Sequence, residues 1–317
     1  MKRLGALVLA VAMVAAAFVA RAALGTDDQD ELTAGGDEQP VGIICASDLA
    51  DRCSAAAVPV AGKPQAGDTA DALIAADDPS DLGGSAWLVT EAWASVVLAE
   101  RERLGREPLF EVAGDALASS GAVLAVWEGR AQQLAARCEL ATDAALGWGC
   151  VAEQAGTELE GGRVRVAGPD IESAAGLVVA AAQSVGFFTG TDFSLADFDT
   201  RGFRSVAAEL SSRTTDSPVR KMRAEGPGQI TAAGSLAVEA TNLASTFGTV
   251  ATSTPEPPVR ADVVLVVPGG TEVPEQQRVA LADALQAAGW DPPSTEPSGL
   301  PSGGVLAAIR TLWSQNR

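Results

Sequence analysis

The chain has 317 residues, 47% of them hydrophobic, which suits one large domain or two lobes and argues against global disorder. Its formal net charge of −19 excludes nucleic acid as a partner, because an acidic surface repels phosphate backbones. The chain contains no His and no Tyr, which excludes Ser-His-Asp and Cys-His catalysis and His-based zinc sites. No GxxxxGK[ST] or GxGxxG string occurs, so we expect no cofactor and no enzyme activity. A hydrolase that uses two carboxylates stays as an alternative, because that chemistry needs only two acids across a cleft.

The N-terminal residues 1–22 have the pattern of an export signal. A basic start is followed by an apolar run over residues 4–20, and Ala20-Arg21-Ala22 matches the A-x-A cleavage pattern. The run is slightly shorter than the roughly 20 residues of a comfortable membrane span, so a cleaved signal and a retained anchor are both kept. Residues 23–40 predict an acidic linker. We expect an extracytoplasmic protein, secreted or anchored to the outer face of the cytoplasmic membrane.

Four cysteines predict two local disulfides. Cys45 and Cys53 lie 8 residues apart, and Cys138 and Cys150 lie 12 residues apart. Four cysteines allow three pairings, and local closure favours these two. Export would keep both bonds stable. A zinc site built from all four is the alternative, but the usual CxxC spacing is missing.

Short apolar runs alternate with helical patterns along the rest of the chain, which predicts an α/β fold with mainly parallel sheets. The helix that follows the expected strand at 262–267 is expected to be capped by Thr271 and ended by Gly289. Acidic, Gly-rich linkers are expected over 189–200 and 213–228. The expected strands are 41–46, 86–89, 122–127, 163–167 and 262–267, and the expected helices are 68–76, one that starts at 90, 128–137, 172–187, 201–212, 235–244, 271–288 and 305–313.

The order of these segments resembles the type 2 periplasmic solute-binding proteins. The segments that carry the likeness are VGIICAS at 41–47, WLVT at 87–90, VLAVW at 123–127 and GPDIESAAGL at 168–177, with the return to the first lobe at 260–268. The likeness covers residues 41–315. It implies two α/β lobes that close on a ligand by hinge motion. Lobe one would hold residues 41–122 and 258–317, and lobe two would hold residues 123–257.

The resemblance also implies where a ligand would bind. In that family, helix N-termini and nearby hydroxyl groups face the cleft and hold polar groups. The candidate ligand-binding residues are Ser47, Thr90, Ser119, Ser120 and Ser173. Each also has a purely structural interpretation as a helix cap or a turn residue. The six tryptophans are interpreted as packing residues.

The resemblance therefore implies a solute-binding protein that holds a small polar ligand between two lobes. Its partners would be that solute and either a membrane transporter or a cell-surface protein. Glu172 beside Ser173 disfavours a simple oxyanion as the ligand. The chain lacks Tyr and shows no assignable anchoring Arg. The alternative is therefore a degenerate binding-protein fold that acts as a cell-surface interaction or accessory module without a small-molecule ligand.

Overall fold

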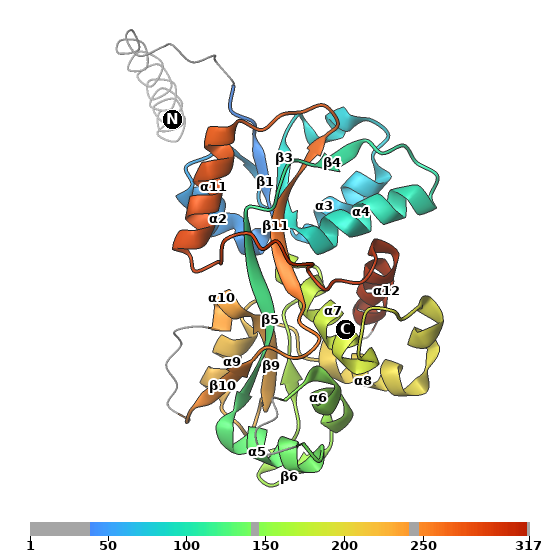
Figure 1. Cartoon of the computed structure of the whole chain (residues 1–317), viewed down its shortest axis with the longest axis vertical. Helices are drawn as coiled ribbons and strands as arrows, with labels where there is room; N and C mark the ends of the chain where they lie inside the picture. The colour runs from blue at the N-terminus through green and yellow to red at the C-terminus, as the bar shows by residue number, and fades with distance from the viewer. Residues whose placement is uncertain (1–38, 141–145, 241–246, 316–317) are drawn as a thin grey trace, which may run out of the picture. The chain divides into compact units, whose positions relative to one another are not determined.

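The computed structural model describes residues 39–140, 146–240 and 247–315, and the helices and strands of residues 40–317 form two lobes (Figure 1). The expected signal or anchor at 1–22, and nearly all of the expected linker, lie outside the described residues. Within the ranges that the structure describes, no helix is long and apolar enough to cross a membrane.

One nine-stranded sheet runs through both lobes in the order β2-β1-β3-β11-β5-β9-β8, with β4 on β11 and β10 on β5. The long strands β5 (Ala118–Trp127) and β11 (Arg260–Pro268) connect the two lobes. Parallel pairing joins β1 to β2 and β3, and β8 to β9. All antiparallel ladders of this sheet involve β5 or β11. The remaining strands are β1 (Ile43–Cys45), β2 (Val60–Gly62), β3 (Ala86–Thr90), β4 (Phe110–Val112), β8 (Val166–Ala167), β9 (Ala232–Leu236) and β10 (Val250–Ser253).

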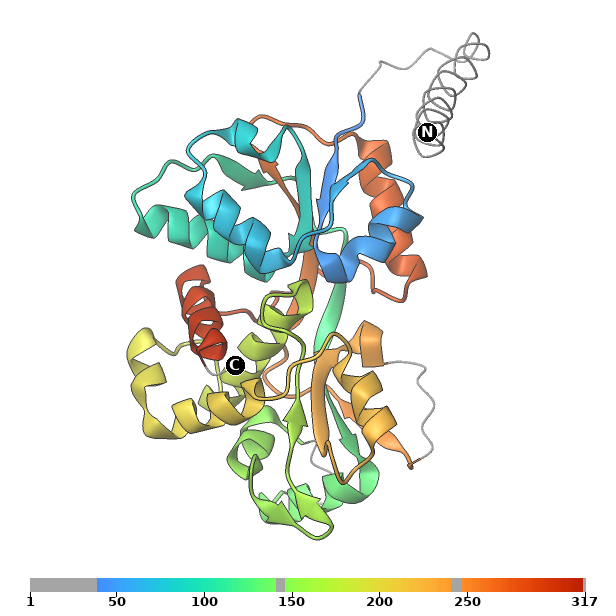
Figure 2. The same ribbon diagram turned by 180° about the vertical axis from the view of Figure 1, so that it is seen from behind.

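Helices cover both faces of the first lobe, with α2 and α11 on one side and α3 and α4 on the other (Figure 1). Their bounds are α2 (Ala50–Ala55), α3 (Ala66–Ala75), α4 (Glu91–Arg103) and α11 (Glu275–Ala287), with the 3-10 helices η1 (Ser47–Leu49) and η2 (Pro79–Leu82). The last helix, α12 (Gly303–Ser314), contacts α4 of the first lobe and also α7 and α8 of the second (Figure 2).

The second lobe is built around α7 (Ala174–Phe188), in which 13 of 15 residues are buried. A helix that is apolar on all sides must be surrounded by other elements. Its small residues let neighbours approach closely: a Cβ on Gly186 would lie 2.5 Å from the Cβ of Trp148. The other elements are α5 (Glu128–Arg137), α6 (Trp148–Gln154), α8 (Arg201–Ser211), α9 (Pro218–Glu225), α10 (Ala237–Ala240), η3 (Leu195–Asp199), β6 (Glu158–Leu159) and β7 (Gly162–Arg163).

The structure confirms the predicted two-lobed α/β fold and both disulfides. Cys45 is bonded to Cys53, and Cys138 is bonded to Cys150. The predicted lobe boundaries fall inside β5 and shortly before β11, and the division into residues 41–122 with 258–317 and residues 123–257 stays a prediction.

Several element predictions were wrong in their bounds. The segment 235–244 was expected to be helical, but its first residues end the buried strand β9, and α10 covers Ala237–Ala240; residues 241–244 lie outside the described residues. Small residues hide this strand in the sequence; they are needed because a Cβ on Gly234 would lie 2.7 Å from Val179. The expected strand 163–167 is split between β7 and β8, and the expected linker 213–228 contains α9. The helix expected to begin at Thr271 begins at Glu275, after Pro274.

Candidate functional site

A cavity of about 630 Å³ is lined by residues of both lobes. The first lobe contributes η1, the start of α2, the segment before α3, and Trp290 after α11. The second lobe contributes the segment that leads into α7, the start of α9, and the junction of β9 with α10. Eight charged side chains line it: the acids Asp48, Asp51, Asp170, Asp216 and Glu239 and the bases Arg52, Lys63 and Arg220.

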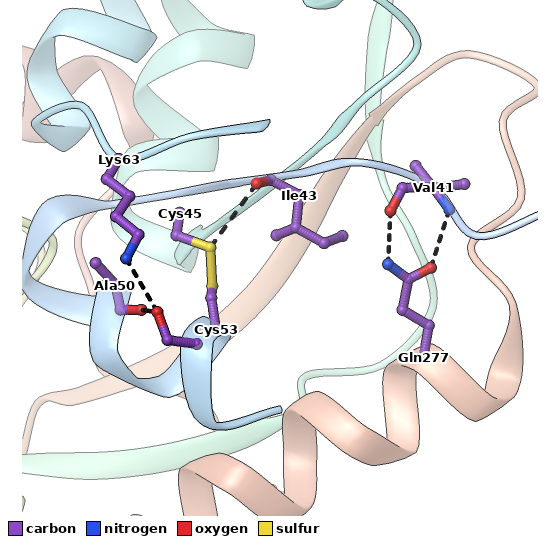
Figure 3. The surroundings of a disulfide bond; sticks show 8 residues. Val41, Ile43, Cys45, Ala50, Cys53, Lys63 and Gln277 are labelled. Atoms are coloured by element: carbon purple, nitrogen blue, oxygen red, sulfur yellow. Dashed lines mark hydrogen bonds between the residues drawn. A yellow bond between two sulfur atoms is a disulfide. The ribbon is translucent and has the colours of Figure 1, made fainter. Parts of the chain in front are cut away.

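The first-lobe wall of the cavity is fixed by a disulfide. Cys45 ends β1 and Cys53 lies in α2, so their bond holds the intervening η1 segment at the carboxyl end of the strand (Figure 3). On the same wall, Lys63 Nζ donates a hydrogen bond of 3.0 Å to Ser54 Oγ (Figure 3). This arrangement directs Asp48 toward the second lobe.

The second-lobe wall is the N-terminus of α7, and Asp48 binds to it directly. The Ala174 N–H donates to Asp48 Oδ1 at 3.1 Å, and the Ala175 N–H donates to Oδ2 at 3.0 Å. The first N–H groups of a helix have no partner inside the helix and carry partial positive charge, so they favour an anion. Here a carboxylate of the same chain takes that position.

Ser173 completes the cap of α7. Its Oγ accepts from the Gly176 N–H at 2.9 Å and donates to the Asp170 carbonyl at 2.7 Å. Together, Asp48 and Ser173 therefore bind three of the first N–H groups of the helix.

Replacing Ser173 with alanine is expected to lower the free energy of unfolding by about 1 to 2 kcal/mol, because one helix N–H then loses its acceptor. Urea unfolding measures this change. Ser302→Ala is the matched control: Ser302 is the N-cap of α12 but makes no side-chain cap hydrogen bond. An equal loss in both variants would show that the hydroxyl of Ser173 does not stabilise α7.

Two cavity carboxyls have a raised pKa. Asp48 is exposed toward the cavity, but the protein atoms around its carboxyl group desolvate it and raise its pKa; the N–H groups of Ala175 and Ala174 act in the opposite direction. Desolvation raises the pKa of Glu239 to about 7. The Ser235 hydroxyl, which donates to Glu239 Oε2 at 2.9 Å, lowers this pKa and so offsets part of the shift. The charge of Asp48 raises the pKa of Glu239 further, and those of Arg52 and Arg220 lower it.

Glu239→Gln tests this perturbation through the pH dependence of stability. The folded protein holds the Glu239 proton more tightly than the unfolded chain does, so this residue's contribution is complete below about pH 4.5 and is lost as the pH rises through about 7. Between pH 5 and pH 8 we expect the wild type to lose about 2 to 3 kcal/mol more than Glu239→Gln. Urea unfolding at both pH values measures the difference, with Glu225→Gln, an exposed carboxyl, as the control. Equal losses in wild type and Glu239→Gln would contradict it.

The predicted ligand-binding residues separate into two groups. Ser47 and Ser173 line the cavity. The other three lie outside its lining, and their hydroxyls bond to the backbone. Thr90 Oγ1 donates to the Ala174 carbonyl, Ser119 Oγ donates to the Pro292 carbonyl, and Ser120 Oγ accepts from the Val238 N–H. The two serines were expected to precede the crossing strand, but both lie within β5. A ligand contact for any of the five stays a prediction.

Its position beside Ser173 suggested that Glu172 would lie at the binding end of the cavity. Glu172 does not line the cavity. It bonds instead to Arg310 of α12, whose Nη2 lies 2.7 Å from Glu172 Oε2. The same guanidinium binds Asp71 of α3, with Nη2 to Oδ2 at 2.9 Å, and lies 5.0 Å from the ring centroid of Trp93. Burial lowers the pKa of Arg310, but the hydrogen bonds with Asp71 and Glu172 outweigh it and leave the pKa above its ordinary value. Arg310 thus ties the two lobes together.

Sequence reasoning named none of the eight charged cavity residues as ligand contacts, among them Asp48, Arg52, Arg220 and Glu239. Asp48 follows Ser47 at an expected helix start, and that position was the available signal. The other three come from α2, α9 and α10, whose convergence depends on how both lobes fold. Across the described ranges, no group of three or more His, Cys, Asp or Glu side chains could hold a metal ion.

Comparison with known proteins shows the fold alone. No protein-family model matches the chain, and no curated protein matches it. Among solved structures, an ABC transporter protein from Clostridium perfringens has a TM-score of 0.50 and 10% identity, over 87% of this chain and 98% of that one. The Atu4243-GABA receptor has a TM-score of 0.50 and 13% identity, over 87% and 90%. Both likenesses concern the fold.

Proposed function

We propose that this chain is an extracytoplasmic solute-binding protein that holds a small polar ligand between its two lobes. The observation that carries the proposal is the cavity, because charged and hydroxyl side chains of both lobes converge on it. Its volume of about 630 Å³ falls in the range of small-molecule sites, roughly 300 to 1,000 Å³. The two fold neighbours are an ABC transporter protein and a GABA receptor, which agrees with this role.

The proposed location rests on two features. The Cys45–Cys53 and Cys138–Cys150 disulfides are typical of oxidising compartments. The basic and apolar residues 1–22 have the pattern of an export signal or anchor. A membrane transporter or a cell-surface protein is the partner that such a location favours. We propose binding rather than catalysis as the activity.

Native mass spectrometry tests the proposal on the full chain, expressed with its export signal and purified without denaturation. We expect a reproducible extra mass that is lost on unfolding. A mass that equals the polypeptide alone, with no thermal stabilisation by pools of small metabolites, would contradict it.

A degenerate binding fold without a small ligand is the second candidate. Two observations favour it: Asp48 occupies the α7 N-terminus from within the chain, and Arg310 joins the lobes through Asp71 and Glu172. Such a protein would keep its lobes closed without a solute. The same mass measurement separates the two candidates, because only the solute-binding protein would carry extra mass or respond to metabolites.

A further inference from the structure

The N-terminus of α7 has no N–H group left for an anionic solute at its first positions. Asp48 accepts from Ala174 and Ala175, and Ser173 accepts from Gly176. A sulfate, phosphate or carboxylate at this point would have to displace Asp48 and would meet its negative charge. Electrostatic repulsion between like charges at hydrogen-bond distance is costly in a partly desolvated site. This end of the cavity therefore rejects anions.

Glu239 adds a second negative group to the same region. Its Oε2 accepts from Ser235, while its other oxygen has no hydrogen-bond partner among the described residues. Glu239 lies near enough to Asp48 for the two charges to interact. A half-buried carboxylate with an unused acceptor favours a donor-rich, positively charged group such as an ammonium, because a charge-assisted hydrogen bond would offset its desolvation.

Two arginines face the cavity from opposite lobes. Arg52 comes from α2 and Arg220 from α9, and neither has an ion-pair partner among the described residues. Both lie within electrostatic range of Glu239. Guanidinium groups without a carboxylate partner suit the carboxylate of a ligand, which they can bind through paired hydrogen bonds.

We infer that the solute is a small zwitterion, with its ammonium group bound by Asp48 and Glu239 and its anionic group bound by Arg52 and Arg220. This inference rests on the proposed function and specifies its ligand class. The cavity is lined by carboxylates and by guanidinium groups, so a solute that carries both signs can pair with both sets. A simple anion or an uncharged sugar would bring no positive group to Asp48 and Glu239.

Thermal-shift measurements with four metabolite pools test the ligand class on the full chain. The pools hold zwitterions (amino acids and betaines), anions without a positive group, amines without a negative group, and neutral sugars. We expect stabilisation by the zwitterion pool alone. Stabilisation by the anion, amine or sugar pool instead would overturn the inference and leave the proposed function intact. No stabilisation by any pool would overturn both.

Titration with sulfate tests the role of Asp48 independently of the natural solute. Asp48→Ala exposes the N–H groups of Ala174 and Ala175, so we expect it to bind sulfate at least about tenfold more tightly than the wild type. Asp51→Ala is the matched control: it removes the same charge from the same cavity wall, and Asp51 makes no hydrogen bond to α7. Equal sulfate binding by wild type and Asp48→Ala would contradict the occupied helix end.

Asp48→Asn covers the case in which the alanine variant fails to fold, because the amide oxygen keeps an acceptor for the helix. We expect this variant to lose at least about tenfold in affinity for the stabilising zwitterion, as measured by calorimetry. Unchanged affinity in a folded Asp48→Asn protein would show that Asp48 does not bind the ammonium group.

Discussion

Replacing Arg310 with alanine is expected to lower the free energy of unfolding by about 2 to 4 kcal/mol. The Arg310 side chain is 18% exposed, and it binds Asp71 of the first lobe and Glu172 of the segment that leads into α7. Its loss leaves Glu172, itself 17% exposed, without a counter-charge. Because Arg310 joins elements of both lobes, we also expect the radius of gyration from small-angle X-ray scattering to increase as the lobes separate.

Arg103→Ala is the matched control for that experiment. Arg103 also pairs with a carboxylate, Glu100, but its side chain is 64% exposed and the pair lies within α4. Exposed pairs contribute about 0 to 1 kcal/mol, so this variant should keep the stability and the scattering curve of the wild type. If the two variants lost equal stability, Arg310 would be an ordinary surface pair and not a connection between lobes.

Gly176→Ala is expected to destabilise the protein by about 3 kcal/mol or more. A Cβ at position 176 would lie 1.7 Å from the Asp170 carbonyl oxygen and 2.9 Å from the Ile171 Cα. Both atoms belong to the backbone, so the segment before α7 would have to move. That movement would disrupt the hydrogen bonds of Asp48 and Ser173 at the helix start. Urea unfolding measures the loss.

A glycine in open space provides the control for Gly176. Gly129 lies in α5, and an added Cβ there would have no neighbour within 4 Å. Alanine favours helices over glycine, so Gly129→Ala should raise stability by up to about 1 kcal/mol. A Gly176→Ala protein as stable as Gly129→Ala would show that the backbone before α7 accommodates a side chain.

The sequence predicted the parts of the fold that depend on neighbouring residues, such as short disulfide loops and helix ends. The two disulfides follow from close spacing, and α5 begins at Glu128 and ends at Arg137 as expected. Gly289, with a positive φ of 94°, follows the end of α11, as expected. The tryptophans are buried as expected, and Trp290 also lines the cavity.

The site was harder to predict because its residues meet only through long-range packing. Thr90, Ser119 and Ser120 have the sequence pattern of cleft hydroxyls, but the backbone groups that bind them come from other parts of the chain. Asp48 binds α7 across 126 residues, and Arg310 meets Glu172 across 138. Neither contact leaves a local spacing pattern in the sequence, so hydroxyl groups near strand ends were favoured over the charged groups that line the cavity.

A crystal structure of the natively purified full-length protein is the decisive test of whether a solute binds between the lobes. We expect density for a small solute in the cavity between the lobes, in contact with Asp48, Glu239 and an arginine from each lobe. A cavity that holds only water, in crystals of protein whose native mass equals the polypeptide alone, would contradict it.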